Sequence, residues 1–199
     1  GTPKNPIATD VRENLRSFLS DPRVIDLPAW KWKPILNTMI LPKRPAKSAK
    51  LYQQIWSSEH GSPLLYYTKK QAEQLQELLP KYEVKFAMSY SDPLISTVLT
   101  EFEVDKINDL TIIPLYPQYS TTTVGSVVDD VNRFYFRRTL IPNLHIITDF
   151  CDFKPYVKAL AAKIQTALAS FQPDELLLSY HGIPKSYAAK GDPYQQRCE

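Results

Sequence analysis

The chain has 199 residues, and 43% of them are hydrophobic, which is enough to bury the core of one large or two small domains. Its 24 Lys and Arg residues are scattered among 21 Asp and Glu residues, so the net charge of +3 argues against a nucleic-acid partner. The two cysteines lie far apart and form no metal-binding spacing, which indicates a reducing, cytosolic setting without a disulfide framework.

The segment 27–56 differs from the rest of the chain, because it combines all three tryptophans with several prolines and many basic residues. This mixture suits a lid over a large, flat, acidic ligand, or contact with the headgroup region of a membrane. A packed helix pair with exposed lysine ends would have the same composition. The residues alone do not separate these alternatives.

Beyond this segment, short apolar runs alternate with stretches of helical period. Four runs have the nearly continuous apolar character of doubly covered parallel strands, at 85–90, 110–115, 144–147 and 175–180. Helical periodicity is present in three stretches, at 71–79, 92–102 and 154–171. Strands that alternate with helices predict an α/β fold with a parallel sheet flanked by helices.

The first candidate functional residue is His181, which follows the predicted strand at 175–180 and precedes the turn Gly182-Ile183-Pro184. In open parallel sheets, ligands bind outside the carboxyl ends of the strands. Imidazole can ligate iron(II) and can accept a proton near neutral pH. His181 is therefore the candidate catalytic and metal-handling residue, although a lone histidine is more often structural.

A polar loop follows the predicted strand at 110–115. It contains Tyr116, Gln118, Tyr119 and Ser120. Its hydroxyls and backbone amides suit a carboxylate or a phosphate, whereas an ordinary capped loop before a helix is the plain alternative. Neither glycine-rich nucleotide motif is present, which disfavours nucleotide binding.

Seven motifs in order carry a resemblance to a known family. They are Gly1-Thr2-Pro3, 18–24, 40–45, 61–64, 115–120, 179–184 and 191–194. Their order and spacing resemble the ferrochelatase series, of bacterial type, from the first residue to the last. The resemblance implies an enzyme of heme biosynthesis that inserts Fe(II) into a porphyrin, either protoporphyrin IX or coproporphyrin III.

The resemblance also implies two Rossmann-like domains of the chelatase type, with the porphyrin between them. Residues 1–153, including the lid at 27–56, would form the first domain, and residues 154–199 would begin the second. A glutamate that stands opposite the histidine in this family would lie beyond Glu199. The resemblance therefore implies a C-terminally truncated chain that is inactive alone.

Within the chain, the resemblance implies that His181 faces the porphyrin core and either delivers the metal or abstracts a pyrrole proton. It assigns substrate binding to Lys43, Arg44, Tyr52, Ser62, Tyr116, Gln118, Tyr119, Ser120 and Arg133. The cationic and hydroxyl side chains in this set suit the carboxylates of a porphyrin, because they can form charge-assisted hydrogen bonds.

Iron(II) and the porphyrin are the expected partners. Some members of the resembled family hold a two-iron two-sulfur cluster with one cysteine near Cys151, but its other ligands would lie outside this chain, so no cluster is expected here. The expected location is the cytoplasm, with peripheral membrane contact through 27–56 as an option. A non-catalytic tetrapyrrole carrier and a cobalt or nickel chelatase stay open as alternatives, as do the choice of porphyrin and the oligomeric state.

Overall fold

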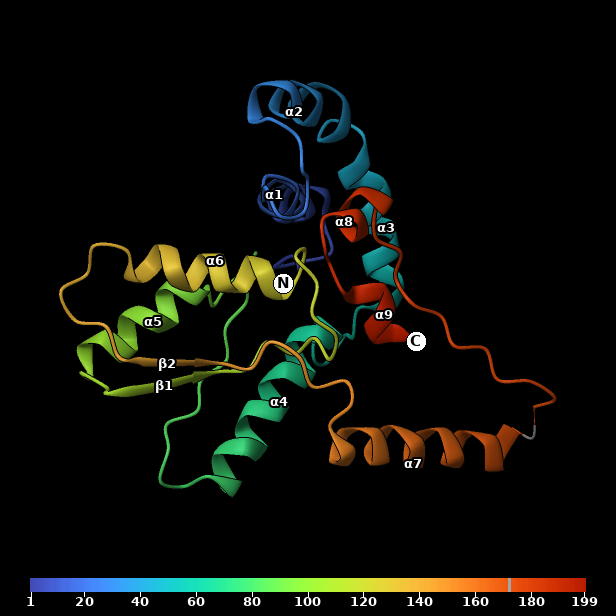
Figure 1. The fold of residues 1–199 in the computed structure, drawn as a ribbon. Coiled ribbons are helices and arrows are strands. Elements are labelled where there is room, and N and C mark those ends of the chain that lie inside the picture. The colour runs from blue at the N-terminus through green and yellow to red at the C-terminus, as the bar shows by residue number, and fades with distance from the viewer. Residues whose placement is uncertain (172) are drawn as a thin grey trace. The chain divides into compact units, whose positions relative to one another are not determined.

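The computed structural model describes residues 1–171 and 173–199 of the chain (Figure 1). In chain order its elements are α1 (Ala8–Leu19), α2 (Ala29–Ile35), the π-helical turn η1 (Leu36–Ile40), α3 (Arg44–Ile55), α4 (Pro63–Leu78), α5 (Ile95–Val104), β1 (Asp109–Ile112), α6 (Val124–Tyr135), β2 (Asn143–Ile146), α7 (Lys154–Phe171), α8 (Lys185–Ala189) and α9 (Tyr194–Cys198). They divide into two compact units, which we call the first unit (Gly1–Asn108 and Ser126–Pro142) and the second unit (Asp109–Gly125 and Asn143–Glu199).

Described helices dominate the first unit, where α1 packs against α3. The π-helical turn places Leu36 and Leu41 in one buried cluster with Leu19 of α1. Trp32 packs against this cluster, and its Nε1 donates a hydrogen bond to the Leu19 carbonyl at 2.6 Å. The segment 27–56 is therefore helical over most of its length, and Trp32, Leu36 and Leu41 pack against Leu19 of α1.

The second unit contains the described sheet, in which β1 and β2 lie side by side and run parallel (Figure 1). Leu110 stands opposite Leu144, and Ile112 stands opposite Ile146. Parallel neighbours need a crossover connection, which here contains α6. The chain thus has the predicted α/β class, with a small parallel sheet and flanking helices.

Two predicted strands, at 110–115 and 144–147, are confirmed with their ends shifted by a few residues. The strand predicted at 85–90 is wrong. Its Met88 instead forms backbone hydrogen bonds with the turn that follows, accepting from Ile95 and donating to Pro93. Local pairing of this kind satisfies the backbone without a neighbouring strand.

The strand predicted at 175–180 is also wrong among the described residues. Residues 173–184, which precede α8, form neither a helix nor a strand (Figure 1), and Leu177 is 89% exposed. An apolar run becomes a strand only where a neighbouring strand supplies hydrogen-bonding partners, and the described residues supply none here.

The helix predictions agree with the structure more closely than the strand predictions, because the contacts that stabilise a helix are local. The helix at 154–171 is confirmed with the same bounds, and the one at 92–102 is present as α5. The helix predicted at 71–79 begins earlier, as α4, because Ser62 caps it and Pro63 occupies its first position. Within the described residues, no helix combines the length and the apolar character needed to cross a membrane.

Candidate functional site

The loop that follows β1 is held by two carboxylates from distant parts of the second unit. The backbone N–H of Tyr119 donates to Asp149 Oδ2 at 2.9 Å. The next two residues both donate to Asp192 Oδ2, through Ser120 Oγ at 3.0 Å and the Thr121 backbone N–H at 2.7 Å. Ser120 is almost completely buried. The predicted substrate loop is therefore fixed in place by acidic side chains.

Asp149, which follows β2, accepts the hydrogen bond from the Tyr119 backbone. Arg197 of α9 donates hydrogen bonds to both of its carboxylate oxygens. Nε donates to Oδ2 at 3.1 Å, and Nη2 donates to Oδ1. Hydrogen bonds from Arg197, and then from the Tyr119 backbone, hold the pKa of Asp149 well below its ordinary value against the opposing effect of burial. Asp149 is thus ionised and engaged at neutral pH.

Asp192 lies in a tight turn that joins α8 to α9. Its backbone N–H donates to the Tyr187 carbonyl at 3.1 Å, and its Oδ1 accepts from the Tyr194 backbone N–H at 3.0 Å. Gly191 before it has φ of +96°, a conformation that glycine adopts without a Cβ penalty. The turn is therefore built so that Asp192 can point both oxygens at backbone and hydroxyl donors.

His181 lies in the same unit, in the irregular segment before α8, and is exposed. The structure thus places His181 in the same compact unit as the loop residues Tyr119 and Ser120. Among the described residues, no group of three or more His, Cys, Asp and Glu side chains is arranged to hold a metal ion.

The other two candidate residues of this loop, Tyr116 and Gln118, are less buried than Ser120. Tyr116 is 39% exposed, and desolvation of its phenol raises its pKa above the ordinary value, so the hydroxyl stays protonated at neutral pH. Gln118 is half-buried. Both side chains are therefore partly exposed to solvent.

The remaining predicted residues lie in the first unit. Lys43 is the N-cap of α3 and Arg44 its first residue, and both are exposed. Two cations at a helix N-terminus oppose the helix dipole, so this placement costs some stability unless an anion binds there. Tyr52, further along α3, is half-buried and meets Trp56 edge to face at 6.4 Å between ring centroids.

Ser62 and Arg133 are both engaged within the protein. Ser62 Oγ donates to Thr2 Oγ1 at 2.8 Å, and both residues are buried. Arg133 NH1 contacts Asp130 Oδ1 at 2.6 Å on the same face of α6, while its side chain is 68% exposed. Ser62 therefore has a structural role. Arg133 would have to break its ion pair with Asp130 before it could bind a ligand.

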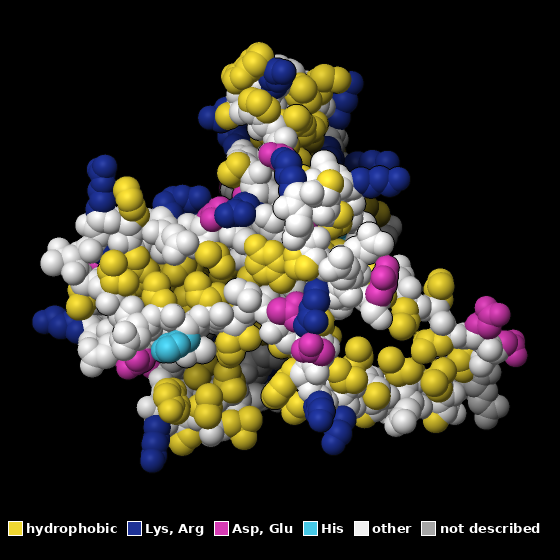
Figure 2. All heavy atoms as spheres, in the orientation of Figure 1, with side chains coloured by type: hydrophobic (Ala, Val, Ile, Leu, Met, Phe, Trp, Pro, Cys, Tyr) yellow, Lys and Arg dark blue, Asp and Glu magenta, His cyan; other side chains and the backbone are white. Residues whose placement is uncertain are grey.

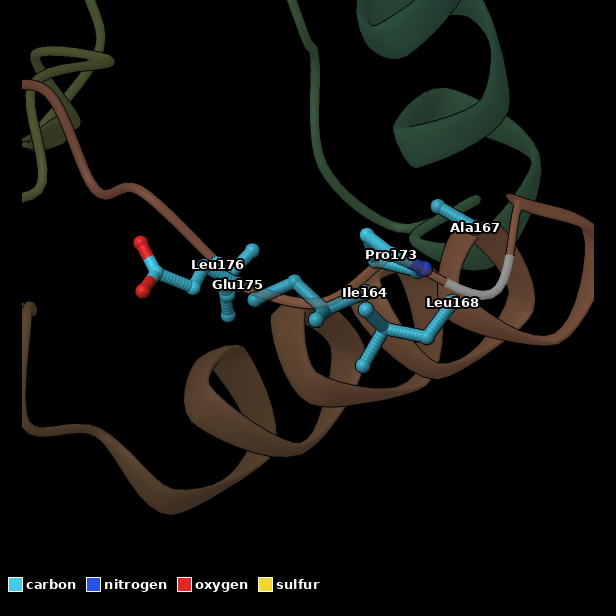
Figure 3. Close-up of a pocket in the computed structure, with 6 residues that line it drawn as sticks. All are labelled: Ile164, Ala167, Leu168, Pro173, Glu175 and Leu176. Carbon is cyan, nitrogen blue, oxygen red and sulfur yellow. The ribbon is translucent and has the colours of Figure 1, made fainter.

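A shallow apolar hollow lies between α7 and the segment that follows it (Figure 3). It is lined by Ile164, Ala167, Leu168, Pro173, Glu175 and Leu176. Ligand sites bring several polar groups together, whereas Glu175 is the one charged residue of this lining. We interpret the hollow as an incompletely filled contact between a helix and the apolar run after it.

Sequence reasoning missed three residues of the network, namely Asp149, Asp192 and Arg197. Asp149 could have been found, because it follows β2 at the carboxyl end of a parallel strand. Asp192 belongs to the motif at 191–194, but the motif gives no sign of a contact with the loop after β1. Its contact with Ser120 spans 72 positions of the sequence, and no local pattern encodes it.

The family model described as Ferrochelatase matches residues 1–199, the whole chain. The chain is 47% identical over 198 residues to the coproporphyrin III ferrochelatase of Enterococcus faecalis, covering 100% of this chain and 63% of that protein. It is 44% identical over 200 residues to the ferrochelatase of Edwardsiella ictaluri, covering 100% and 62%. For the coproporphyrin III ferrochelatase of Lactococcus lactis subsp. cremoris, the identity is 45% over 199 residues, covering 100% and 60%. The chain thus spans about three fifths of the length of these relatives.

Proposed function

The chain belongs to the ferrochelatase family, and on that premise we propose that the protein inserts iron(II) into a porphyrin, with His181 as its metal-handling residue. The observation that supports this most directly is that His181 lies in the same compact unit as the loop after β1, which Asp149 and Asp192 hold by hydrogen bonds. This unit combines an exposed imidazole with a fixed polar loop. Such a unit can hold a ligand and act on it.

Insertion exchanges two pyrrole protons for one iron(II) ion, so the reaction requires a proton acceptor and a route for the metal. A neutral imidazole can accept a pyrrole proton and pass it to water, or can release a bound iron(II) to the pyrrole nitrogens. His181 is exposed and can reach a ligand. Tyr116 and Gln118 would contact the macrocycle from the adjoining loop.

For the propionate groups of the porphyrin we propose Lys43 and Arg44 as the main partners. Both are exposed cations at the N-terminus of α3, where unpaired backbone N–H groups and the helix dipole also favour an anion. Tyr52, Ser62 and Arg133 are proposed as further contacts. Ser62 is the weakest member of this set, since its proton is directed to Thr2.

Of the three relatives described above, two are named for coproporphyrin III, which has four carboxylates, while the third carries the name ferrochelatase alone. Protoporphyrin IX and coproporphyrin III are therefore both proposed substrates. Comparing kcat/KM for the two porphyrins, with zinc as a fluorescent replacement for iron, identifies the preferred one. Binding of a porphyrin without any metal insertion by the complete protein would instead support the carrier function.

The central test is His181→Ala in the complete protein. We expect porphyrin binding, measured by absorbance titration, to persist while insertion slows by about 100-fold or more. His145→Ala is the matched control, because His145 is exposed on β2 and takes no part in the proposed chemistry. Insertion by the His181→Ala variant at the wild-type rate would contradict the assignment.

A second test addresses the cations of α3. Replacing Lys43 and Arg44 by alanine is expected to weaken porphyrin binding about tenfold, since two charge-assisted contacts are lost. Lys47→Ala with Lys50→Ala is the matched control, because these exposed lysines lie on the same helix three and six residues after Arg44. Equal affinities for the two double variants would remove Lys43 and Arg44 from the proposed site.

We further propose that residues 1–153 form the first of two chelatase domains and that the second begins with α7, which starts at Lys154. We place the protein in the cytoplasm, where Cys151 and Cys198 would remain free thiols, as they are here. An iron-sulfur cluster needs four ligands, and the chain contains two cysteines, so its own residues do not fit one.

Peripheral membrane contact is proposed for α2 and the turn after it. Figure 2 shows apolar side chains over this part of the first unit with basic side chains around them. Trp30 is 74% exposed and Met39 64% exposed, and Lys31 lies over the Trp30 ring at 5.0 Å. Flotation with anionic vesicles is expected to fall when Trp30 and Met39 are replaced by alanine, and unchanged flotation would refute the contact.

A further inference from the structure

The loop after β1 is fixed along its backbone by hydrogen bonds from other segments of the second unit. The Phe150 backbone N–H donates to the Pro117 carbonyl at 2.9 Å, and the Tyr119 backbone N–H donates to Asp149 Oδ2 at 2.9 Å. The contacts with Asp192 fix the residues that follow. Because the first two contacts use backbone atoms of the loop, they set the path of the chain without using the Tyr119 side chain.

Asp149 is the acceptor through which α9 reaches this loop. Arg197 donates from Nε to Asp149 Oδ2 at 3.1 Å and from Nη2 to Oδ1. Oδ2 thus accepts from Arg197 and from the Tyr119 backbone together. A two-point contact between a guanidinium and a carboxylate fixes the orientation of both groups. Arg197 therefore sets where Asp149 presents its oxygen to the loop.

The other contacts of Arg197 and Asp149 indicate what the loss of the guanidinium would do. Nη2 of Arg197 also lies 3.1 Å from Asp152 Oδ2, so one guanidinium contacts two carboxylates. Without it, Asp149 and Asp152 would repel each other. Beside the Tyr119 N–H, Asp149 would keep the backbone and the thiol of Cys151, which donate at 3.4 Å each. The Asp149 side chain is 20% exposed, so the carboxylate could turn toward water and leave the Tyr119 N–H without its acceptor.

We propose that Arg197 is a positioning residue for the porphyrin, which acts through Asp149 to keep the loop at 116–121 in the conformation that binds the macrocycle. The proposal rests on the proposed function, because the ligand is the porphyrin that this loop would contact. A loop that already has its bound conformation loses less conformational freedom on binding, and the affinity is higher for that reason. Arg197 thus contributes to porphyrin affinity without touching the porphyrin.

The expected effect is on porphyrin affinity and not on the chemical step. Apparent affinity falls in proportion to the fraction of molecules whose loop is competent to bind. We expect Arg197→Ala to leave about one molecule in ten with the native loop, so porphyrin Kd and KM should rise about tenfold in the complete protein. The kcat for zinc insertion should stay within about twofold, since a rise in KM alone reflects lost ground-state binding.

A double-mutant cycle separates this role from a direct contact between Arg197 and a porphyrin carboxylate. Asp149→Ala should raise porphyrin Kd by a similar factor, and adding Arg197→Ala should raise it no further, because both act on one connection. Full additivity would indicate a direct contact and would refute the positioning role. Lys163→Ala is the control for charge, because Lys163 is an exposed cation on α7 in the same unit.

A purely structural role of Arg197 predicts a different result. Arg197→Ala would then lower Tm and leave porphyrin Kd and KM unchanged, which would also refute the positioning role. Arg197→Lys serves as the second variant if the alanine variant folds poorly. It keeps the charge but loses the two-point contact, so we expect its porphyrin Kd to rise about threefold.

Hydrogen exchange supplies a readout that does not depend on activity. In Arg197→Ala the Tyr119 amide should exchange faster, whereas Lys163→Ala should leave its exchange unchanged. If the unaltered protein binds porphyrin but inserts no metal, the proposed function fails, while the change in Kd still decides the role of Arg197. If it inserts metal and Arg197→Ala keeps the wild-type Kd and KM, the positioning role is refuted and the proposed function stands.

Discussion

Replacing Ser62 by alanine tests whether this residue serves the fold. The substitution removes the donor to Thr2 Oγ1 at 2.8 Å and the cap that accepts from the Leu65 N–H at 3.4 Å. Loss of a cap costs about 1 kcal/mol, with the low end appropriate to so long a contact. Leaving the buried Thr2 hydroxyl without its donor costs about 1–3 kcal/mol more. The total of about 2–3 kcal/mol lowers Tm by about 5–10 °C in a domain of this size.

Differential scanning calorimetry of the complete protein measures this loss. Ser58→Ala is the control, since Ser58 is exposed in the nearby turn and its replacement should cost less than about 0.5 kcal/mol. Adding Thr2→Val to Ser62→Ala should recover part of the stability, because both polar partners are then absent. An unchanged Tm together with a raised porphyrin KM would refute the reasoning, because Ser62 would then serve the ligand and not the fold.

Three further predictions concern the second unit. The pKa of Asp149 is depressed by Arg197, so its stabilising effect is complete above the unfolded-state pKa of about 4 and is lost as pH falls toward the lower folded-state value. Tm should therefore fall more steeply below pH ~4 in the unaltered protein than in Asp149→Asn, and parallel curves would contradict this. Gly191→Ala should lower Tm, because φ there is +96°, whereas Gly182→Ala, where a Cβ meets open space, should not. Burial and then Asp149 raise the pKa of Cys151, so its alkylation at pH ~7 should be slower than that of a free thiol and should accelerate in Asp149→Asn.

The sequence was informative wherever the stabilising contacts are local. The helix at 154–171 has a continuous apolar period and begins and ends as predicted. The strand predictions depended on partners that a single run of residues does not reveal. Residues 110–115 meet a parallel neighbour, while the equally apolar run at 175–180 meets none among the described residues and stays irregular.

The candidate site divides in the same way. His181 and the loop after β1 could be predicted, because functional side chains follow strands in parallel sheets and because the motifs resemble a family. The contacts that hold the loop could not, since Asp192 lies 72 positions from Ser120 and looks like an ordinary turn residue. Ser62 shows the opposite case, in which a residue predicted for the ligand also has a structural role that local sequence does not reveal.

The use of the two carboxylates bears on how iron(II) would be handled. The Asp149 carboxylate accepts hydrogen bonds from Arg197 and the Tyr119 backbone. The Asp192 carboxylate accepts hydrogen bonds from the loop and from its own turn. Neither is therefore free to join His181 as a metal ligand. A tight iron(II) site needs several ligands around one point, and the described residues form no such group. Under the proposed function, the second unit offers the imidazole of His181 without a carboxylate ligand from this network, and a metal held by so few ligands can be passed on to the pyrrole nitrogens.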